Sequence, residues 1–99
     1  MRATIIADDN AVYVSGEALA VDLAGLDPDI HAVQWHGEAG IGEIEYRYHF
    51  ATNTRRPNER FADFAPFQVF VDRWNVAKAA QQVKPAPPAS GAPINVIAD

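Results

Sequence analysis

The stretch that decides the fold is "HAVQWHGEAGIGEIEY", residues 31–46 of a chain of 99 residues. Its three glycines are typical of a loop that binds phosphate, and its histidines and glutamates are typical of metal sites or acid–base pairs. A phosphate-binding glycine loop, however, leads into a helix, whereas these glycines lead into alternating apolar and polar residues. Alternation on both sides of the glycines predicts a β-hairpin instead.

The alternation also predicts how the two strands pair. With the turn centred on residues 39 and 40, one register places every large apolar side chain on the same face. That register extends the second strand to Phe50 and pairs Trp35 with Ile44, Val33 with Tyr46 and His31 with Tyr48. The opposite face then carries polar pairs, with His36 across from Glu43 and Gln34 across from Glu45.

Other strands are expected on both sides of this hairpin. Short β-branched or alternating runs predict strands at 3–7, 11–14 and 17–23, and a last short strand at 59–63. Asn10 and the Ser15-Gly16 pair mark the turns between the first three strands. We therefore expect an antiparallel β-meander of about five strands.

The period of the apolar residues changes after residue 63, where a helix is predicted over 64–82. Its apolar stripe is Phe67, Phe70, Val71 and Trp74, at the spacing of one helix face. Asp63 is a candidate cap, and Pro66 suits the first turn. The fold class is thus α+β, with the helix covering one face of the sheet. The aromatic residues are better explained as core than as a stacking platform for sugars or bases; the expected core is Val33, Trp35, Tyr46, Phe67, Phe70 and Trp74.

The composition changes again at residue 84. Four prolines fall within residues 85–93, which favours an extended, polyproline-like backbone. We therefore divide the chain into a domain at 1–83 and an extended C-terminal arm at 84–99. The arm ends in apolar residues that a solvated tail does not need, so it is expected to bind a partner by adding a strand to a neighbouring sheet. The predicted partner-binding residues are Pro93, Ile94, Val96 and Ile97 of the arm, with Val69 and Val76 on the second face of the helix.

Composition argues against several classes of function. The chain has no cysteine, which removes disulfides, thiolate metal sites and cysteine nucleophiles. The net charge is −5 and the basic residues are scattered, so we expect no nucleic-acid partner. No apolar run approaches the length of about 20 residues that crosses a bilayer, so no membrane partner is expected.

Ser15 and Ser90 lie in a turn and in the arm, and neither has the setting of an activated nucleophile. We predict no catalytic residues, no enzymatic activity and no cofactor.

A metal site is the remaining chemical hypothesis. In the predicted register His36 and His49 share the polar face of the hairpin with Glu43 and Glu45. No two histidines have the i, i+4 spacing of a helical metal motif, and hairpin faces commonly carry mixed polar pairs. We therefore interpret this face as solvated and expect no metal ligands.

Five short motifs resemble a known family. "HAVQW" (31–35), "EIEY" (43–46), "PNER" (57–60), "APFQ" (65–68) and "VDRW" (71–74) together resemble small proteins and N-terminal domains of tailed bacteriophages and prophages, encoded among tail and tail-fibre genes. The resemblance covers about residues 5–80. It carries over no catalytic residue.

The resemblance implies a structural component of the virion: a tail, collar, baseplate or tail-fibre-associated protein that acts by protein–protein contacts. The implied partners are other tail and virion proteins, and the implied arrangement is several symmetric copies. The implied location is the tail region of the virion, with the host cytoplasm during assembly. One alternative is a chaperone-like assembly factor that does not stay in the virion. A weaker alternative is a small carbohydrate- or metal-binding module.

Overall fold

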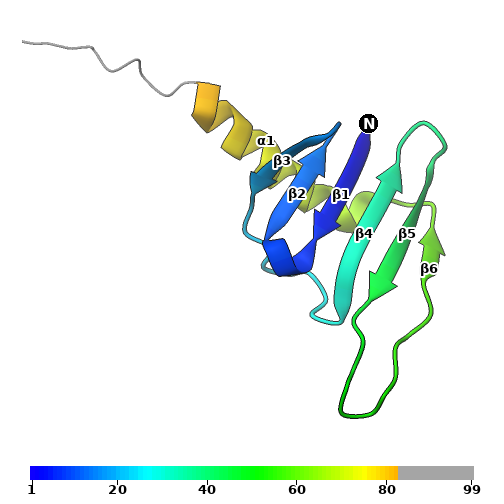
Figure 1. Cartoon of the computed structure of the whole chain (residues 1–99). Coiled ribbons are helices and arrows are strands. Elements are labelled where there is room, and N and C mark those ends of the chain that lie inside the picture. The colour runs from blue at the N-terminus through cyan, green and yellow to red at the C-terminus, as the bar shows by residue number, and fades with distance from the viewer. Residues whose placement is uncertain (83–99) are drawn as a thin grey trace, which may run out of the picture.

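The computed structural model describes residues 1–82, and their central feature is a six-stranded antiparallel sheet (Figure 1). The strands are β1 (Arg2–Ile6), β2 (Ala11–Val14), β3 (Glu17–Ala20), β4 (Ile30–His36), β5 (Ile41–Tyr46) and β6 (Glu59–Phe61). A 3-10 turn, η1 (Ala7–Asp9), joins β1 to β2. A second 3-10 turn, η2 (Ala65–Phe67), leads into the single α-helix, α1 (Gln68–Gln82). The α+β class is confirmed, with six strands where about five were expected.

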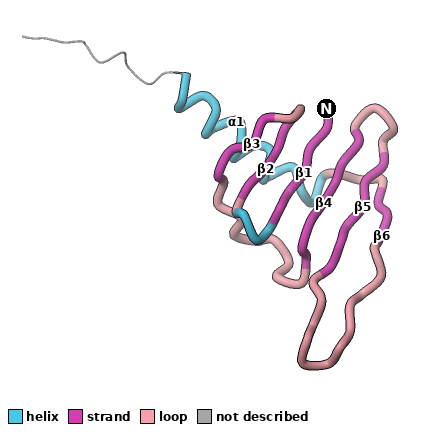
Figure 2. The backbone as a smooth tube through the Cα atoms, in the orientation of Figure 1, coloured by secondary structure: helices cyan, strands magenta, loops and turns pink. Residues whose placement is uncertain are grey.

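The order of the strands differs from a simple meander. It is β3-β2-β1-β4-β5-β6, so β4 pairs with β1 and not with β3 (Figures 1 and 2). β1 is thus a central strand, and the inward-facing Ile5 is 1% exposed. β3 has the sequence "EALA", with a single large apolar side chain, Leu19, and lies at the edge. β1 is apolar and rich in β-branched residues, so its side chains gain more burial from a neighbouring strand on each side than the side chains of β3 would. This difference explains why β4 pairs with β1 and not with β3.

The hairpin of residues 31–46 is present, but its register differs from the predicted one by two residues. Trp35 lies opposite Gly42, and Val33 lies opposite Ile44. The turn spans residues 37–40, where Gly40 has a φ of +65° and its N–H donates to the His36 carbonyl at 2.9 Å. A glycine at a positive φ closes this turn earlier than the alternation alone indicates.

Two further predictions about the hairpin were wrong. A shift in register between Ile30 and Ala32 removes His31 from the predicted pairing with Tyr48 and places it 3.6 Å from Asp8. β5 ends at Tyr46, so Tyr48 and Phe50 are 43% and 87% exposed and do not extend the apolar face. The bulge and the early strand end both follow from the loops at this end of the sheet, which the alternating pattern does not encode.

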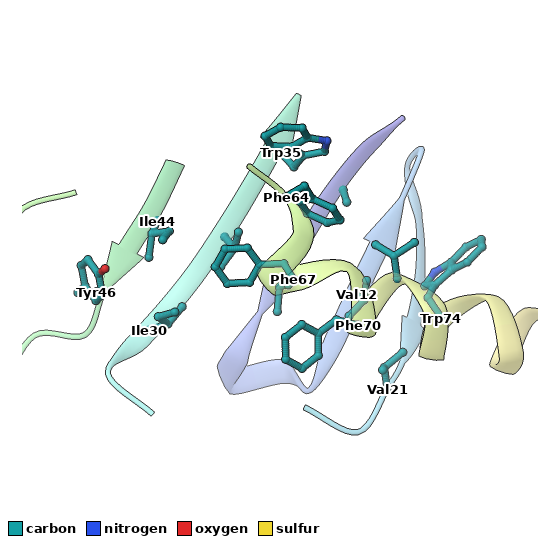
Figure 3. Close-up of a cluster of buried hydrophobic side chains, with 14 residues drawn as sticks. Val12, Val21, Ile30, Trp35, Ile44, Tyr46, Phe64, Phe67, Phe70 and Trp74 are labelled. Atoms are coloured by element: carbon teal, nitrogen blue, oxygen red, sulfur yellow. The ribbon is translucent and has the colours of Figure 1, made fainter. Parts of the chain in front are cut away.

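The core lies between the sheet and the segment 64–74 (Figure 3). Phe64 and Phe67 cover the β4–β6 half, and the Phe64 ring is 5.1 Å from the Trp35 ring, centroid to centroid. Phe70 and Trp74 belong to α1, which packs on β2 and β3. All six predicted core residues are buried in this one cluster, namely Val33, Trp35, Tyr46, Phe67, Phe70 and Trp74.

Polar contacts fix the helix at both ends of its packed segment. The cap residue of η2 is Phe64 and not the predicted Asp63, but the Asp63 carboxylate accepts the Ala65 N–H at 3.0 Å and so bonds to the start of this turn. The Trp74 indole N–H donates to the Glu17 carbonyl at 3.0 Å, and Lys78 pairs with the Glu17 carboxylate at 2.6 Å. The helix is therefore bound to the edge strand as well as to the core.

Candidate functional site

The loop between β5 and β6, residues 47–58, projects beyond the end of the sheet (Figures 1 and 2). It is longer than most connections in compact domains, and it has internal order. The His49 N–H donates to the Thr54 carbonyl at 2.7 Å, and the Thr54 N–H donates back at 3.2 Å. The hydroxyls of Thr52 and Thr54 lie 2.7 Å apart. We call residues 47–58 the projecting loop.

The topology brings the acidic partners of this loop to its base. In an antiparallel sheet the β1–β2, β3–β4 and β5–β6 connections all lie at one end, as Figure 1 shows. Asp8 comes from the first connection, and Asp27 and Asp29 come from the second. The third connection contains three arginines, one histidine and no acidic residue. Opposite charges from distant parts of the sequence therefore meet at this end of the sheet.

Arg47 holds the start of the loop. Its guanidinium donates to Asp8 at 2.5 Å through Nη1 and to the Pro28 carbonyl at 3.0 Å through Nε. Its backbone N–H donates to the Asp29 carbonyl at 2.8 Å. Three contacts to two other connections leave this residue little freedom.

Asp29 ties the two sides of the loop together. One carboxylate oxygen lies 2.5 Å from His49 Nε2, on the outgoing side. The other accepts a hydrogen bond from Arg56 at 3.2 Å, on the returning side. The Arg56 guanidinium also lies 3.7 Å from the centre of the Tyr46 ring, and the Tyr46 hydroxyl donates to Glu59 at 2.5 Å. Paired charges thus join both sides of the loop to Asp29 at its base.

These contacts shift the pKa values of three residues at the base of the projecting loop. The hydrogen bond from His49 lowers the pKa of Asp29, and the contact with Arg56 acts in the same direction. The hydrogen bond from Arg47 lowers the pKa of Asp8. The hydrogen bond to Glu59, assisted by burial, raises the pKa of the Tyr46 hydroxyl. Both aspartates are therefore held in the charged form and the tyrosine in the neutral form.

Two aromatic rings are exposed on the outgoing side of the projecting loop, Tyr48 just before the His49–Thr54 bridge and Phe50 just after it. Tyr48 and Phe50 meet edge to face with centroids 4.8 Å apart. Phe50 is 87% exposed, the largest value among the large apolar residues at 1–82. A hollow of about 310 Å³ lies beside the rings and is lined by Asp8, His31, Tyr46, Arg47, Tyr48, Phe50 and Arg55. The arrangement offers apolar surface and guanidinium groups to a ligand at the same place.

A second hollow, of about 440 Å³, lies near the other end of the sheet. It is lined by Met1, Arg2, Ser15, His36, Gly37 and Glu38. Within residues 1–82 no three histidine, aspartate or glutamate side chains converge as a metal-binding group. The predicted pairs on the polar face were wrong: on β4, His36 lies opposite Ile41 and Gln34 lies opposite Glu43. His49 lies beyond β5 and pairs with Asp29. The structure therefore does not bring the two histidines together on one strand face.

The predicted partner-binding residues fall in two groups. Val69 and Val76 are 42% and 70% exposed on α1, and their coverage by a neighbour stays a prediction. Pro93, Ile94, Val96 and Ile97 lie outside the described residues, as does the predicted arm at 84–99. No helix within residues 1–82 combines the length and the apolar character needed to cross a membrane.

Sequence reasoning overlooked the projecting loop. Residues 51–58 show no alternation, so their pattern predicts only a polar connection. The available signal was compositional: a cationic loop without acids, in a chain with a net charge of −5, needs acidic partners from elsewhere.

Comparisons with known proteins found no matching family model, no matching curated protein and no matching solved structure. The role that the five motifs imply by resemblance is therefore a proposal.

Proposed function

We propose that this chain is a non-enzymatic structural domain that binds other proteins through the projecting loop, and that it serves in the tail region of a tailed bacteriophage particle. The observation that supports the binding role is the pair of exposed aromatic rings, Tyr48 and Phe50, on a loop whose base is joined to two other connections by ion pairs. The resemblance of the five motifs supports the setting. The partners in this proposal are other tail proteins, and several symmetric copies of the chain contact them.

The exposed rings of Tyr48 and Phe50 suit a binding role for energetic reasons. Fully burying a phenylalanine side chain contributes roughly 1.5–3 kcal/mol, and Phe50 leaves nearly all of that unused in the isolated chain. Aromatic residues are enriched in protein interfaces, where a few well-buried side chains supply most of the binding energy. A partner that covers Phe50 and Tyr48 gains this energy directly.

The contacts at the base of the loop restrict its backbone before any partner binds. Asp29 joins the two sides of the loop, and Arg47 joins it to the β1–β2 connection. Ordering a flexible segment on binding costs free energy for each side chain and backbone unit immobilised. A loop that is already held in place presents its aromatic rings with less of that cost.

The setting is tested by the composition of purified particles from the phage or prophage that encodes the chain. We expect the protein in the particles, in a fixed molar ratio to the tail proteins, by quantitative mass spectrometry. Protein found only in the lysate and never in particles would contradict the virion role and favour the assembly-factor alternative.

The role of the loop is tested in the same particles with Phe50→Ala. This change removes a ring that is 87% exposed, so the melting temperature should stay the same while incorporation into particles is lost. Tyr13→Ala is the matched control, because it removes another exposed aromatic ring from a different surface and should incorporate normally. Full incorporation of Phe50→Ala would show that binding occurs elsewhere, with Val69 and Val76 the next residues to change.

A further inference from the structure

The charges of the projecting loop are not all used by the fold. Arg47 pairs with Asp8, and Arg56 pairs with Asp29. Arg55 is exposed, forms no ion pair with any residue of 1–82, and lines the hollow beside the Tyr48 and Phe50 rings. One cation of the loop is thus available to a ligand.

Arg55 lies on the same hollow as the two aromatic rings. Tyr48 and Phe50 supply exposed aromatic rings to its lining, and Arg47 lines it together with its carboxylate partner Asp8. The volume of about 310 Å³ is at the lower end of the range for ligand sites, enough for a few side chains. A matching ligand carries one anionic group next to an apolar group.

On this basis we infer that the projecting loop binds an acidic segment of a partner protein. A carboxylate of that segment pairs with Arg55, and the neighbouring apolar side chain packs against Tyr48 and Phe50. The inference rests on the proposed function, since it names the chemistry of the partner that the loop takes.

A carboxylate fits this surface better than a polyphosphate does. Guanidinium and carboxylate groups form paired hydrogen bonds, and one available arginine satisfies one carboxylate. A nucleic acid needs several neutralising cations, whereas Asp8, Asp27 and Asp29 already surround the base of the loop. A protein segment with one isolated carboxylate is repelled less by these three aspartates than a polyphosphate is.

The test uses the full chain, labelled with nitrogen-15, and three capped peptides observed by NMR titration. The acidic probe is Gly-Ser-Glu-Phe-Ser-Gly, with one glutamate next to one apolar residue, and the two matched probes replace this Glu by Lys or by Gln. We expect the acidic peptide to shift the amide signals of residues 47–56 and to bind about tenfold more tightly than the lysine peptide, with an affinity that falls as salt is added.

Two variants locate the interaction. Arg55→Glu should weaken binding of the acidic peptide about tenfold, and Arg2→Glu, the same charge change on β1, should leave it within about twofold. Both positions are exposed, and thermal melting checks that both variants fold. Equal binding of all three peptides, or binding unchanged by Arg55→Glu, would overturn the inference. Tighter binding of a short oligothymidylate would assign the loop to nucleic acid instead.

The particle assay separates this inference from the proposed function. If Phe50→Ala is lost from particles but Arg55→Glu incorporates normally and the acidic peptide does not bind, docking by the loop stands and the acidic partner is wrong. If both variants incorporate fully, docking by the loop is itself wrong. Loss of both variants together with selective binding of the acidic peptide supports the two proposals jointly.

Discussion

Gly42 illustrates how single residues account for the glycine-rich stretch. A Cβ atom at this position would lie 2.4 Å from the Phe61 ring and 2.6 Å from the Gln34 carbonyl oxygen. The residue is therefore glycine because β6 packs its phenylalanine directly over the strand, beside Trp35. Gly40, by contrast, supplies the positive φ of the turn. Two glycines of the stretch thus have different structural roles, and neither role requires a ligand.

Replacing Gly42 with alanine tests the packing role. The added methyl group must displace Phe61 or separate two strands, so we expect unfolding to become easier by about 1–3 kcal/mol, measured by urea denaturation. Glu43→Ala is the control, because this neighbour lies opposite Arg60 and should change stability by less than about 1 kcal/mol. Equal effects of the two changes would show that the contact with Phe61 is easily relieved.

Among the elements, the connections at one end of the sheet depend on one another. Asp8 follows β1, Asp29 precedes β4, and the projecting loop follows β5, yet their side chains form one set of ion pairs. Such pairs contribute little each when exposed, but Asp29 is only 21% exposed and serves two partners. The order of the projecting loop therefore depends on the charge of residues in other connections.

Acid should release the projecting loop by protonating these carboxylates. The folded pKa of Asp29 lies below its ordinary value of 3.8, so its stabilising effect is complete above that pH and is lost as the pH falls through the folded pKa. We expect the protection of the His49 and Thr54 amides from hydrogen exchange, measured against the rate of an unstructured peptide at the same pH, to fall in that acid range.

Two variants check the assignment of this acid effect. Asp29→Asn should show low protection of the His49 and Thr54 amides at every pH, and Asp9→Asn, a nearby carboxylate without an ion pair in residues 1–82, should behave like the wild type. Acid-dependent protection that persists in Asp29→Asn would assign the effect to another group, with Asp8 the first candidate.

In the whole molecule, residues 1–82 form one layer of sheet and one layer of helix, and the second face of the sheet is uncovered (Figure 1). The uncovered face alternates with the buried one along each strand, so Gln34 and His36 are exposed while Val33 and Trp35 are buried. One core cluster joins all six strands or their flanks to the segment 64–74. A single cooperative unit is therefore expected within this part of the chain.

A chain that ends at residue 83 tests this division. We expect its free energy of unfolding to lie within about 0.5 kcal/mol of the full chain, because the core cluster lies entirely within residues 3–74. A larger loss of stability in chemical denaturation would mean that residues 84–99 belong to the folded unit. Loss of the shortened protein from particles, at unchanged stability, would support the predicted partner contact of Pro93 to Ile97.

The sequence by itself determined the features that repeat along the chain. Alternation predicted the hairpin, and the 3.6-residue period predicted the helix and its buried residues Phe67, Phe70 and Trp74, since periodicity records which face of an element avoids water. Only the tertiary structure decided the pairing of β1 with β4, the register set by Gly40 and Gly42, and the ion pairs of Asp29 with the projecting loop. These features join residues far apart in sequence through packing and charge, and such contacts leave no periodic signal because each is made once, between partners that only the folded chain brings together.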